Sequence, residues 1–492
     1  MITFQPSAAV WEITMGCNMR CKHCGSSCKS SLPDELTTDE ALDLCNQLAS
    51  LGIKAVTLSG GEPLLRNDWE QIATRLSELD IQPLIISNGW LVDEVVVKKI
   101  CKSGIASFGI SLDGLRDTHD FMRCEGSFDG IMKALQMLAD NSIHTSVVTT
   151  INKRNLSELH EIKNILIQHD VKSWQLQFAT PMGSFHAHKD ELMIESHQVS
   201  DIINFAHEVK DEINVYLGDC IGYYSNVEHE VRKKNSSDEG AVWRGCPAGK
   251  HSLGILHNGD IVGCNSIRSQ EFIEGNIREK RLQDIWESGF TWNRQFSRSK
   301  LTGFCLDCQY ATYCLGGCPN VRLCLNGSIE SDNSYCLYNS EIRAEFGRID
   351  LEGVSFDDMV GLLGDASEGQ NHNLEIMMIE KYLHKNIDLP KTQMSYLMNC
   401  LHFAYFQVER YEKAKEVCDA ILNYNGNNSY ALHGLAICLF YLGKRAEGFD
   451  ILERLAKVDK SMLEETVRDI CSATQLTHSV EDLRALETLI EH

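Results

Sequence analysis

The first two hundred residues alternate short apolar runs with amphipathic stretches. The apolar runs are rich in β-branched residues and end near Thr14, Ser59, Asn88, Leu112, Ile151 and Ala179. Stretches with helical periodicity lie between them, such as TTDEALDLCNQLASLG and GSFDGIMKALQMLADN. Six strand-then-helix units at a spacing of roughly thirty residues predict an α/β fold, a parallel sheet curled into a partial (β/α)6 barrel.

The first of these helices has clear end signals. Thr37, Thr38 and Glu40 form a plausible capping box at its start, and Gly52 follows its last periodic residue. These signals predict where the helix begins and ends.

The last third of the chain has helical periodicity throughout. SYLMNCLHFAYFQVERYEKAKEVCDAILNYNGNN and SYALHGLAICLFYLGKRAEGFDILERLAKVDKSM align at a period of about 34 residues, with Leu401 over Leu435 and Ala414 over Gly448. This period, with small residues at the second pair, resembles tetratricopeptide repeats. Such helix pairs stack into a concave binding surface, so we expect a partner protein or peptide there. A helical cap without a partner is the alternative.

Composition and charge narrow the function classes. A length of 492 residues favours roughly three domains, and 43% hydrophobic with 23% charged residues is typical of packed globular proteins. A formal net charge of -23 without a block of Lys and Arg argues against nucleic acid binding. The N-terminal stretch lacks the features of a signal peptide, and no window approaches 18 uninterrupted apolar residues. We therefore expect a cytoplasmic protein that does not bind membranes.

Three of the 20 cysteines cluster directly after the first predicted strand, in MGCNMRCKHCGSSC. Cytoplasmic thiols stay reduced, so metal binding explains a cluster better than disulfides do. A structural zinc site would require four ligands in matched pairs, whereas four-iron clusters are commonly held by four thiolates. Cys17, Cys21 and Cys24 would leave one iron open to a ligand that is not protein.

Other unusual residues also follow predicted strands, where the chemistry of such barrels lies. SGGEP follows the second strand and contains Gly60, Gly61 and Glu62. The glycine pair would allow backbone to approach a cofactor closely, and Glu62 is able to accept from an ammonium group. Asp113 follows the fourth strand.

These motifs together resemble radical S-adenosylmethionine (SAM) enzymes. CNMRCKHC matches the CxxxCxxC motif of that superfamily, and SGGEP matches its GGE motif. The resemblance implies that SAM binds the open iron and is cleaved to a 5'-deoxyadenosyl radical that abstracts hydrogen from a substrate. It further implies that Gly60, Gly61 and Glu62 hold the methionyl amine, that Ser111 and Asp113 contact the ribose or carboxylate, and that Arg123 pairs with the carboxylate. A tight turn beside a chance cysteine cluster is the alternative.

A second set of cysteines lies between residues 220 and 336. Cys246, Gly259 and Cys264 give the pattern CX12GX4C, and CLDCQYATYCLGGC supplies Cys305, Cys308, Cys314 and Cys318 before Cys336. The whole pattern resembles the seven-cysteine signature of the SPASM extension, which implies two auxiliary 4Fe-4S clusters beside the SAM-binding one. Zinc is the alternative, because CxxC pairs are typical of zinc ribbons.

The resemblance also implies how the auxiliary clusters are ligated. The outer cluster would take Cys305, Cys308, Cys314 and Cys336, and the inner one Cys246, Cys264 and Cys318. Cys220 is the candidate for the vacant inner position. Without it, the inner cluster would have an open iron for a substrate group.

Three domains follow: a radical SAM partial barrel over 1–215, a SPASM auxiliary-cluster domain over 216–345 and a tetratricopeptide-like helical domain over 346–492. Because SPASM-bearing radical SAM enzymes mostly modify peptides or proteins, the resemblance implies a maturase of a ribosomally made precursor peptide that installs a carbon-carbon or thioether crosslink. A flavodoxin or ferredoxin-type reductant is the expected electron donor.

Two further functions compete. Formylglycine formation, as in anaerobic sulfatase maturases, is disfavoured because that branch typically has Asp after the second SPASM cysteine, where this chain has Asn265. An iron-sulfur scaffold that binds a partner through its repeats would consume no SAM, and its partner binding would survive Cys21→Ala.

Overall fold

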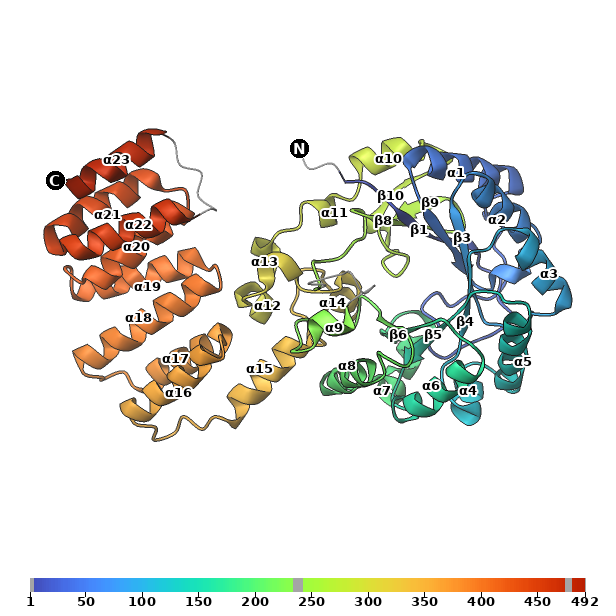
Figure 1. The fold of residues 1–492 in the computed structure, drawn as a ribbon, viewed down its shortest axis with the longest axis horizontal. Coiled ribbons are helices and arrows are strands. Elements are labelled where there is room, and N and C mark those ends of the chain that lie inside the picture. Colours follow the sequence, from blue (N-terminus) through green and yellow to red (C-terminus); the bar gives the residue numbers. More distant parts are fainter. Residues whose placement is uncertain (1–3, 233–241, 474–479, 492) are drawn as a thin grey trace. The chain divides into compact units, whose positions relative to one another are not determined.

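The fold was obtained as a computed structural model that describes residues 4–232, 242–473 and 480–491. The chain divides into two compact units (Figure 1). The first comprises Met1–Leu306 with Thr312–Ser340, and the second comprises Asp307–Ala311 with Glu341–His492. The three predicted domain boundaries stay a prediction.

A curved sheet forms the centre of the first unit (Figure 1). Its strands are β1 (Ala8–Thr14), β2 (Ala55–Gly60), β3 (Gln82–Ser87), β4 (Ser107–Ser111), β5 (Thr145–Ile151), β6 (Ser173–Phe178), β7 (Val215–Leu217), β8 (Ser252–Ile255), β9 (Asp260–Val262) and β10 (Ile273–Asn276). The order is β10-β9-β8-β1-β2-β3-β4-β5-β6-β7, and β1 to β7 pair parallel. The predicted fold class is confirmed.

Helices follow the strands of the barrel and cover its outer face (Figure 1). They are α1 (Thr38–Leu51), α2 (Trp69–Glu78), α3 (Glu94–Lys102), α4 (Arg116–Met122), α5 (Ser127–Asp140), α6 (Leu159–Gln168), α7 (Lys189–Leu192) and α8 (Val199–Glu208). The capping box of Thr37 and Glu40 is present, and Gly52 ends α1 in the left-handed conformation. Trp11, Leu58, Phe108 and Trp174 are fully buried between sheet and helices. With parallel strands, all the loops after the carboxyl ends meet at one edge.

The sheet continues beyond the six predicted strands. β7 adds to β6, and β8 pairs parallel with β1, Ala8 opposite Ser252. β9 and β10 then extend this edge in antiparallel fashion. One sheet therefore carries both the barrel and the first part of the second cysteine-rich region.

Short helices and loops hold most of the second cysteine set. The helices of this region are α9 (Glu228–Val231), α10 (Leu282–Ser288), α11 (Thr291–Arg294), α12 (Gly303–Asp307), α13 (Ala311–Cys314), α14 (Pro319–Asn326) and α15 (Leu337–Arg348). These helices are 4 to 12 residues long, so loops make up much of this region.

The second unit is helical. Its helices are α16 (Phe356–Glu368), α17 (His372–Lys385), α18 (Lys391–Gln407), α19 (Tyr411–Tyr424), α20 (Ser429–Tyr441), α21 (Arg445–Val458), α22 (Lys460–Ser472) and α23 (Val480–Glu491). Consecutive helices pack against each other. Ala414 is fully buried, and a Cβ at Gly448 would lie 2.8 Å from the Phe440 ring, so both positions require small residues. The helical region is confirmed, and its assignment to tetratricopeptide repeats stays a prediction.

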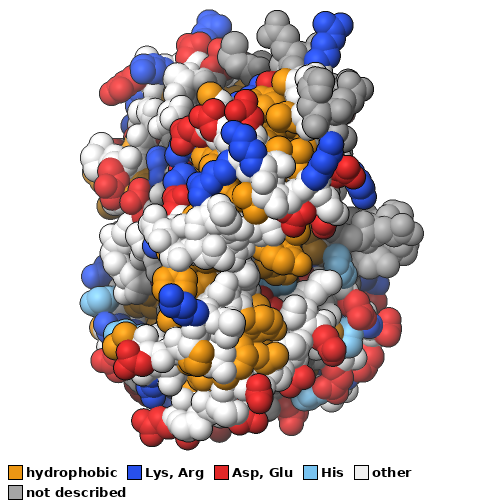
Figure 2. All heavy atoms as spheres, turned by 90° about the vertical axis from the view of Figure 1, so that its left-hand side faces the viewer, with side chains coloured by type: hydrophobic (Ala, Val, Ile, Leu, Met, Phe, Trp, Pro, Cys, Tyr) orange, Lys and Arg blue, Asp and Glu red, His pale blue; other side chains and the backbone are white. Residues whose placement is uncertain are grey.

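Large hydrophobic side chains lie on the surface of this unit, and Figure 2 shows hydrophobic side chains on the face that it views. The exposed large ones are Ile387, Tyr396, Phe403, Tyr424 and Tyr430. Within the described part of the chain, no helix combines the length and the apolar character that a membrane span requires.

Candidate functional site

Cys17, Cys21 and Cys24 lie in the loop that follows β1. Backbone hydrogen bonds hold this loop: the Cys17 N–H donates to the Lys29 carbonyl (2.9 Å), and the Cys24 carbonyl accepts from the Ser184 N–H (2.8 Å) after β6. Burial is the main reason that the pKa of the Cys21 thiol rises to about 11, and the charges of Cys24 and Cys17 add to it. The three motif thiols are thus within electrostatic reach of one another, and binding iron would release their protons.

A fourth thiol stands beside this set, which the motif did not reveal. Cys28 is buried and donates a hydrogen bond to the Cys24 sulfur, which lowers the pKa of Cys24 to about 5. The only signal for it in the sequence is its place four residues after Cys24.

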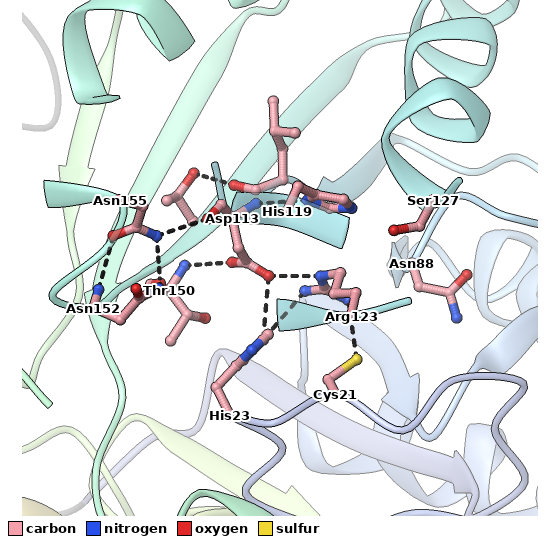
Figure 3. A network of polar contacts seen from close by, with 12 residues as sticks. Cys21, His23, Asn88, Asp113, His119, Arg123, Ser127, Thr150, Asn152 and Asn155 are labelled. Atoms are coloured by element: carbon pink, nitrogen blue, oxygen red, sulfur yellow. Dashed lines mark hydrogen bonds and ion pairs between the residues drawn. The ribbon is translucent and has the colours of Figure 1, made fainter. Parts of the chain in front are cut away.

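Asp113 and Arg123 form a buried ion pair beside the cysteine loop (Figure 3). The Arg123 Nε donates to the Asp113 Oδ2 at 2.6 Å, and its Nη1 lies 3.8 Å from the Cys21 Sγ. The His23 Nε2 lies 3.2 Å from the same Asp113 oxygen. Burial alone would raise the pKa of Asp113, but the charges of Arg123 and His23 outweigh it and hold that pKa well below its usual range. The pair joins the loop after β4 to the cysteine loop after β1.

The other side of Asp113 is held by the chain itself (Figure 3). Its Oδ1 accepts from the Thr150 N–H at 2.8 Å, and its own N–H donates to the His119 Nδ1 at 3.1 Å. Burial lowers the pKa of His119 to about 4, so the ring is neutral near pH 7. Sequence reasoning missed both His23 and His119, although His23 stands inside the CxxxCxxC motif.

The GGE loop packs against the start of the cysteine loop. A Cβ at Gly60 would lie 2.2 Å from the Thr14 carbonyl oxygen, and one at Gly61 would lie 2.1 Å from that of Gly16. The Gly61 and Glu62 N–H groups donate to these same oxygens, each at 2.8 Å. The sequence predicted close approach to a cofactor; in this structure the glycines make close approach to the chain's own backbone.

Glu62 is fully buried and links two strand ends. Its carboxylate accepts from the Ser87 hydroxyl at 2.8 Å and from the Asn88 N–H at 2.7 Å. Burial raises its pKa to about 6, although these hydrogen bonds oppose the rise. Ser111 is the last residue of β4 and is half-buried. The residues predicted to bind SAM thus meet at the carboxyl edge of β1 to β4.

Cys220, Cys246, Cys264 and Cys318 come together in a second group of half-buried thiols. The charges of the other three all act on the Cys318 thiol, whose pKa burial raises well above its usual value. Burial also raises the pKa of Cys246 to about 12 and that of Cys220 to about 11. The thiol predicted to fill the vacant inner position therefore lies with the other three.

The outer set is only partly assembled within the first unit. The Asn333 N–H donates to the Cys305 Sγ at 3.4 Å, and the charge of Cys336 helps to raise the pKa of Cys305, after burial and Asp332. Cys314 lies at the end of α13. Cys308 falls in the segment assigned to the second unit, and its place among the ligands stays a prediction.

The donor chemistry of both half-buried thiol groups fits iron-sulfur clusters. Thiolate is the usual ligand of four-iron clusters, and each thiolate binds a different iron. Over the ranges that the structure describes, no three His, Cys, Asp or Glu side chains are arranged to hold a single metal ion.

A salt bridge connects the two cysteine regions. Arg268, four residues after Cys264, donates through Nη2 to the Glu12 Oε1 (2.7 Å) on β1 and to the Ser26 hydroxyl (2.9 Å) in the first cysteine loop. Because Glu12 is buried, this contact orients the second region against the first.

Comparison with known proteins agrees with this geometry. The family model of the Radical SAM superfamily matches residues 11–166, and that of the SPASM iron-sulfur cluster-binding domain matches residues 246–309. The chain contains a radical SAM domain and a SPASM domain. The radical SAM match covers the cysteine loop, the GGE loop and the Asp113–Arg123 pair, and the SPASM match includes Cys246, Cys264, Cys305 and Cys308.

Curated relatives align with about two thirds of the chain. An AdoMet-dependent heme synthase of Methanosarcina barkeri is 28% identical over 68% of this chain and 98% of its own length. The mycofactocin maturase MftC of Mycolicibacterium smegmatis is 24% identical over 68% of this chain and 83% of its own. The prediction of an enzyme is thereby confirmed over that of a scaffold.

Solved structures share the fold. SuiB of Streptococcus suis, bound to its precursor peptide SuiA, aligns with a TM-score of 0.55 at 19% identity, over 68% of this chain and 76% of that one. The anSMEcpe enzyme with bound AdoMet and the Cp18Cys peptide aligns with a TM-score of 0.54 at 16% identity, over 70% and 97%.

Proposed function

We propose that this protein is a radical SAM maturase that abstracts hydrogen from a ribosomally made precursor peptide and installs a carbon-carbon or thioether crosslink. The observation that carries the proposal is the combination of three motif thiols and a separate group of four half-buried thiols in one compact unit. The first set suits SAM cleavage, and the second suits an auxiliary cluster that accepts an electron or binds the substrate.

The proposed roles in the barrel follow from position. Cys17, Cys21 and Cys24 would hold a 4Fe-4S cluster, and with only three protein thiolates this cluster would leave a position for SAM. When bound and reduced, this cluster supplies the electron that cleaves SAM to a 5'-deoxyadenosyl radical. Arg123 and Asp113 present a cation and an anion beside Cys21, as contacts with the carboxylate and ribose require.

The remaining predicted SAM contacts flank this pair. Ser111 lies two residues before Asp113, at the end of β4. Glu62 has its carboxylate fixed by Ser87 and Asn88, so with Gly60 and Gly61 it offers the methionyl amine a rigid acceptor. A rigid acceptor orients SAM without a reorganisation cost.

The auxiliary clusters complete the proposed machinery. Cys220, Cys246, Cys264 and Cys318 would hold the inner cluster with every iron bound by protein, which favours electron transfer over direct substrate binding. Cys305, Cys308, Cys314 and Cys336 would hold the outer cluster, which would supply a route for electron exchange with a flavodoxin or ferredoxin-type reductant.

A peptide substrate is supported by two of the similarities. SuiB is similar in fold and was solved with its precursor peptide, and the mycofactocin maturase aligns with 68% of the chain. Residues 341–492 of the helical unit lie outside both family-model matches, and this unit exposes large hydrophobic residues, which would suit recruitment of the precursor or of a partner protein.

The test uses the full chain, purified anaerobically and reconstituted with iron and sulfide. Three clusters require about twelve irons per chain, with zinc counted in the same sample. The reduced protein is incubated with SAM and with peptides encoded beside its gene, and 5'-deoxyadenosine and peptide mass are followed. We expect 5'-deoxyadenosine release and a peptide lighter by two hydrogen atoms. Both should disappear in Cys21→Ala and persist in the control Cys45→Ala, which removes a buried thiol of α1. SAM cleavage without any peptide change would refute the peptide assignment.

Tetrapyrrole oxidation is the second candidate. Two similarities favour it. The M. barkeri heme synthase aligns with this chain over 98% of its own length, and an Fe-coproporphyrin III synthase of the same organism is 27% identical to this chain. Adding an iron porphyrin that carries propionates to the same assay distinguishes the peptide substrate from the tetrapyrrole substrate. Only the true substrate class should stimulate 5'-deoxyadenosine release and itself change in mass. Formylglycine formation remains disfavoured, since Asn265 has no carboxylate and its amide donates to the Ile255 carbonyl at 3.2 Å.

A further inference from the structure

A buried arginine that has no carboxylate partner among the described residues lies in the second cysteine-rich region. Arg322, on α14, is 1% exposed, and the Cβ that Gly316 lacks would lie 2.9 Å from its Cζ. Its Nη2 donates to the Leu315 carbonyl at 3.0 Å and its Nη1 to the Ile329 carbonyl, while its Nε is buried with no hydrogen-bond partner in the described structure. Carbonyl dipoles alone are a weak compensation for a buried charge.

The ionisable groups around Arg322 are mostly thiols. Burial lowers the pKa of Arg322, and the groups that oppose this most are Cys305, Cys314, Tyr223 and Cys318. No carboxylate is among these groups. Cys305 and Cys314 belong to the predicted outer set and Cys318 to the inner set, so the guanidinium has ionisable neighbours from both sets.

The loop geometry places the arginine there. Leu315, Gly316 and Gly317 connect Cys314 to Cys318, and both glycines have left-handed φ angles of 80° and 72°. A Cβ at Gly317 would lie 2.4 Å from the Tyr223 ring. The glycine pair therefore allows the loop to wrap around the guanidinium on one side and Tyr223 on the other. Arg322 also lines a cavity together with Cys246 and Gly317, within the same unit.

We propose that Arg322 is the counter-cation shared by the two auxiliary clusters, and that it raises their reduction potentials. The inference rests on the proposed function, because it requires that both clusters are present. Reduction adds one electron to a cluster and makes it more negative by one charge, so a fixed cation nearby stabilises the reduced form. Arg322 keeps its proton throughout, because a guanidinium does not titrate in the working range. A higher potential makes each auxiliary cluster a better acceptor of the electron that the substrate radical gives up.

The experiment measures potential rather than turnover. Cys17, Cys21 and Cys24 are replaced by Ala together, so that only the auxiliary clusters remain, and Arg322→Gln and Arg322→Lys are made in this background. Iron content is determined, and EPR signals are followed during titration with dithionite. Arg322→Gln should shift the reduction equilibrium of at least one cluster about tenfold toward the oxidised form, equivalent to about 59 mV for one electron. Arg322→Lys, which keeps the charge, should stay near the parent.

Arg294→Gln is the matched control. Arg294 donates to the Gly249 and Trp286 carbonyls in the same domain, but its neighbouring charge is the carboxylate of Glu274. Removing it should leave the potentials unchanged.

Each outcome has a definite meaning. Unchanged potentials in Arg322→Gln with full iron content would overturn the inference and leave Arg322 a packing residue. Iron loss in Arg322→Gln but not in Arg322→Lys would support it, because charge would then be needed to hold the clusters, whereas loss in both would overturn it. Absence of auxiliary iron in the parent itself would instead refute the proposed function.

Discussion

The buried pair of Asp113 and Arg123 should be strongly coupled in the folded protein. Asp113 is fully buried and the Arg123 side chain is 8% exposed, with a nitrogen-to-oxygen distance of 2.6 Å. At an effective dielectric constant of about 20, two unit charges at that distance attract by about 6 kcal/mol, before the cost of desolvating them. Removing one partner of a buried pair typically costs about 3–5 kcal/mol, because the other charge is left uncompensated.

A double-mutant cycle tests this in the metal-free protein. Asp113→Asn keeps an oxygen for the Thr150 N–H but leaves Arg123 with only partial compensation from Cys21. Arg123→Met leaves the Asp113 carboxylate with His23 and the Thr150 N–H but without its guanidinium partner. We expect each single variant to lose about 3–5 kcal/mol of unfolding free energy, and the double variant to lose at least about 2 kcal/mol less than the sum.

The chain offers a clean assay for this cycle. Its tryptophans all lie in the first unit: Trp11, Trp69, Trp90, Trp174, Trp243, Trp286 and Trp292. Tryptophan fluorescence in a urea titration therefore reports unfolding of that unit and not of the helical one. The exposed pair Arg116 and Asp129 is the control, and water should screen its coupling to a much smaller value. Additivity within about 0.5 kcal/mol at the buried pair would refute the reasoning.

Three further predictions use the same protein. Burial raises the pKa of Glu62 to about 6, so its contribution to stability falls as pH rises from about 4.5 to 6. The unfolding free energy of Glu62→Gln should therefore rise relative to wild type by about 2 kcal/mol between pH 4 and pH 7. A difference between the two proteins that does not change with pH would contradict this. Gly61→Ala puts a Cβ 2.1 Å from the Gly16 carbonyl oxygen and should cost about 1–3 kcal/mol in urea unfolding, whereas wild-type stability would show that the loop shifts freely. Cys220→Ala should change the EPR spectrum of the inner auxiliary cluster while leaving SAM cleavage by the first cluster intact, and an unchanged spectrum would remove Cys220 from the ligand set.

Local signals in the sequence located most of the barrel. The predicted strand ends at Thr14 and Ile151 are observed unchanged, and the other four differ by one residue. The helix over 38–51 starts and stops where its capping box and glycine indicated. These features depend on periodicity and on contacts a few residues apart, which a sequence displays directly. The cysteine spacings likewise carried the identity of both domains.

Only the tertiary structure decided the contacts between segments that are distant in the sequence. The sequence showed Asp113 and Arg123 as separate candidates for SAM, and the fold joined them into one ion pair with His23. It also brought Cys220 to Cys318.

The glycines of the GGE loop, expected to face a cofactor, pack against the backbone of the cysteine loop, because β1 and β2 are neighbours in the sheet. Periodicity and spacing determine which elements form and which residues end each strand. The order of strands in the sheet determines which of those ends meet, and the charge of each buried group then depends on the neighbours that this order supplies.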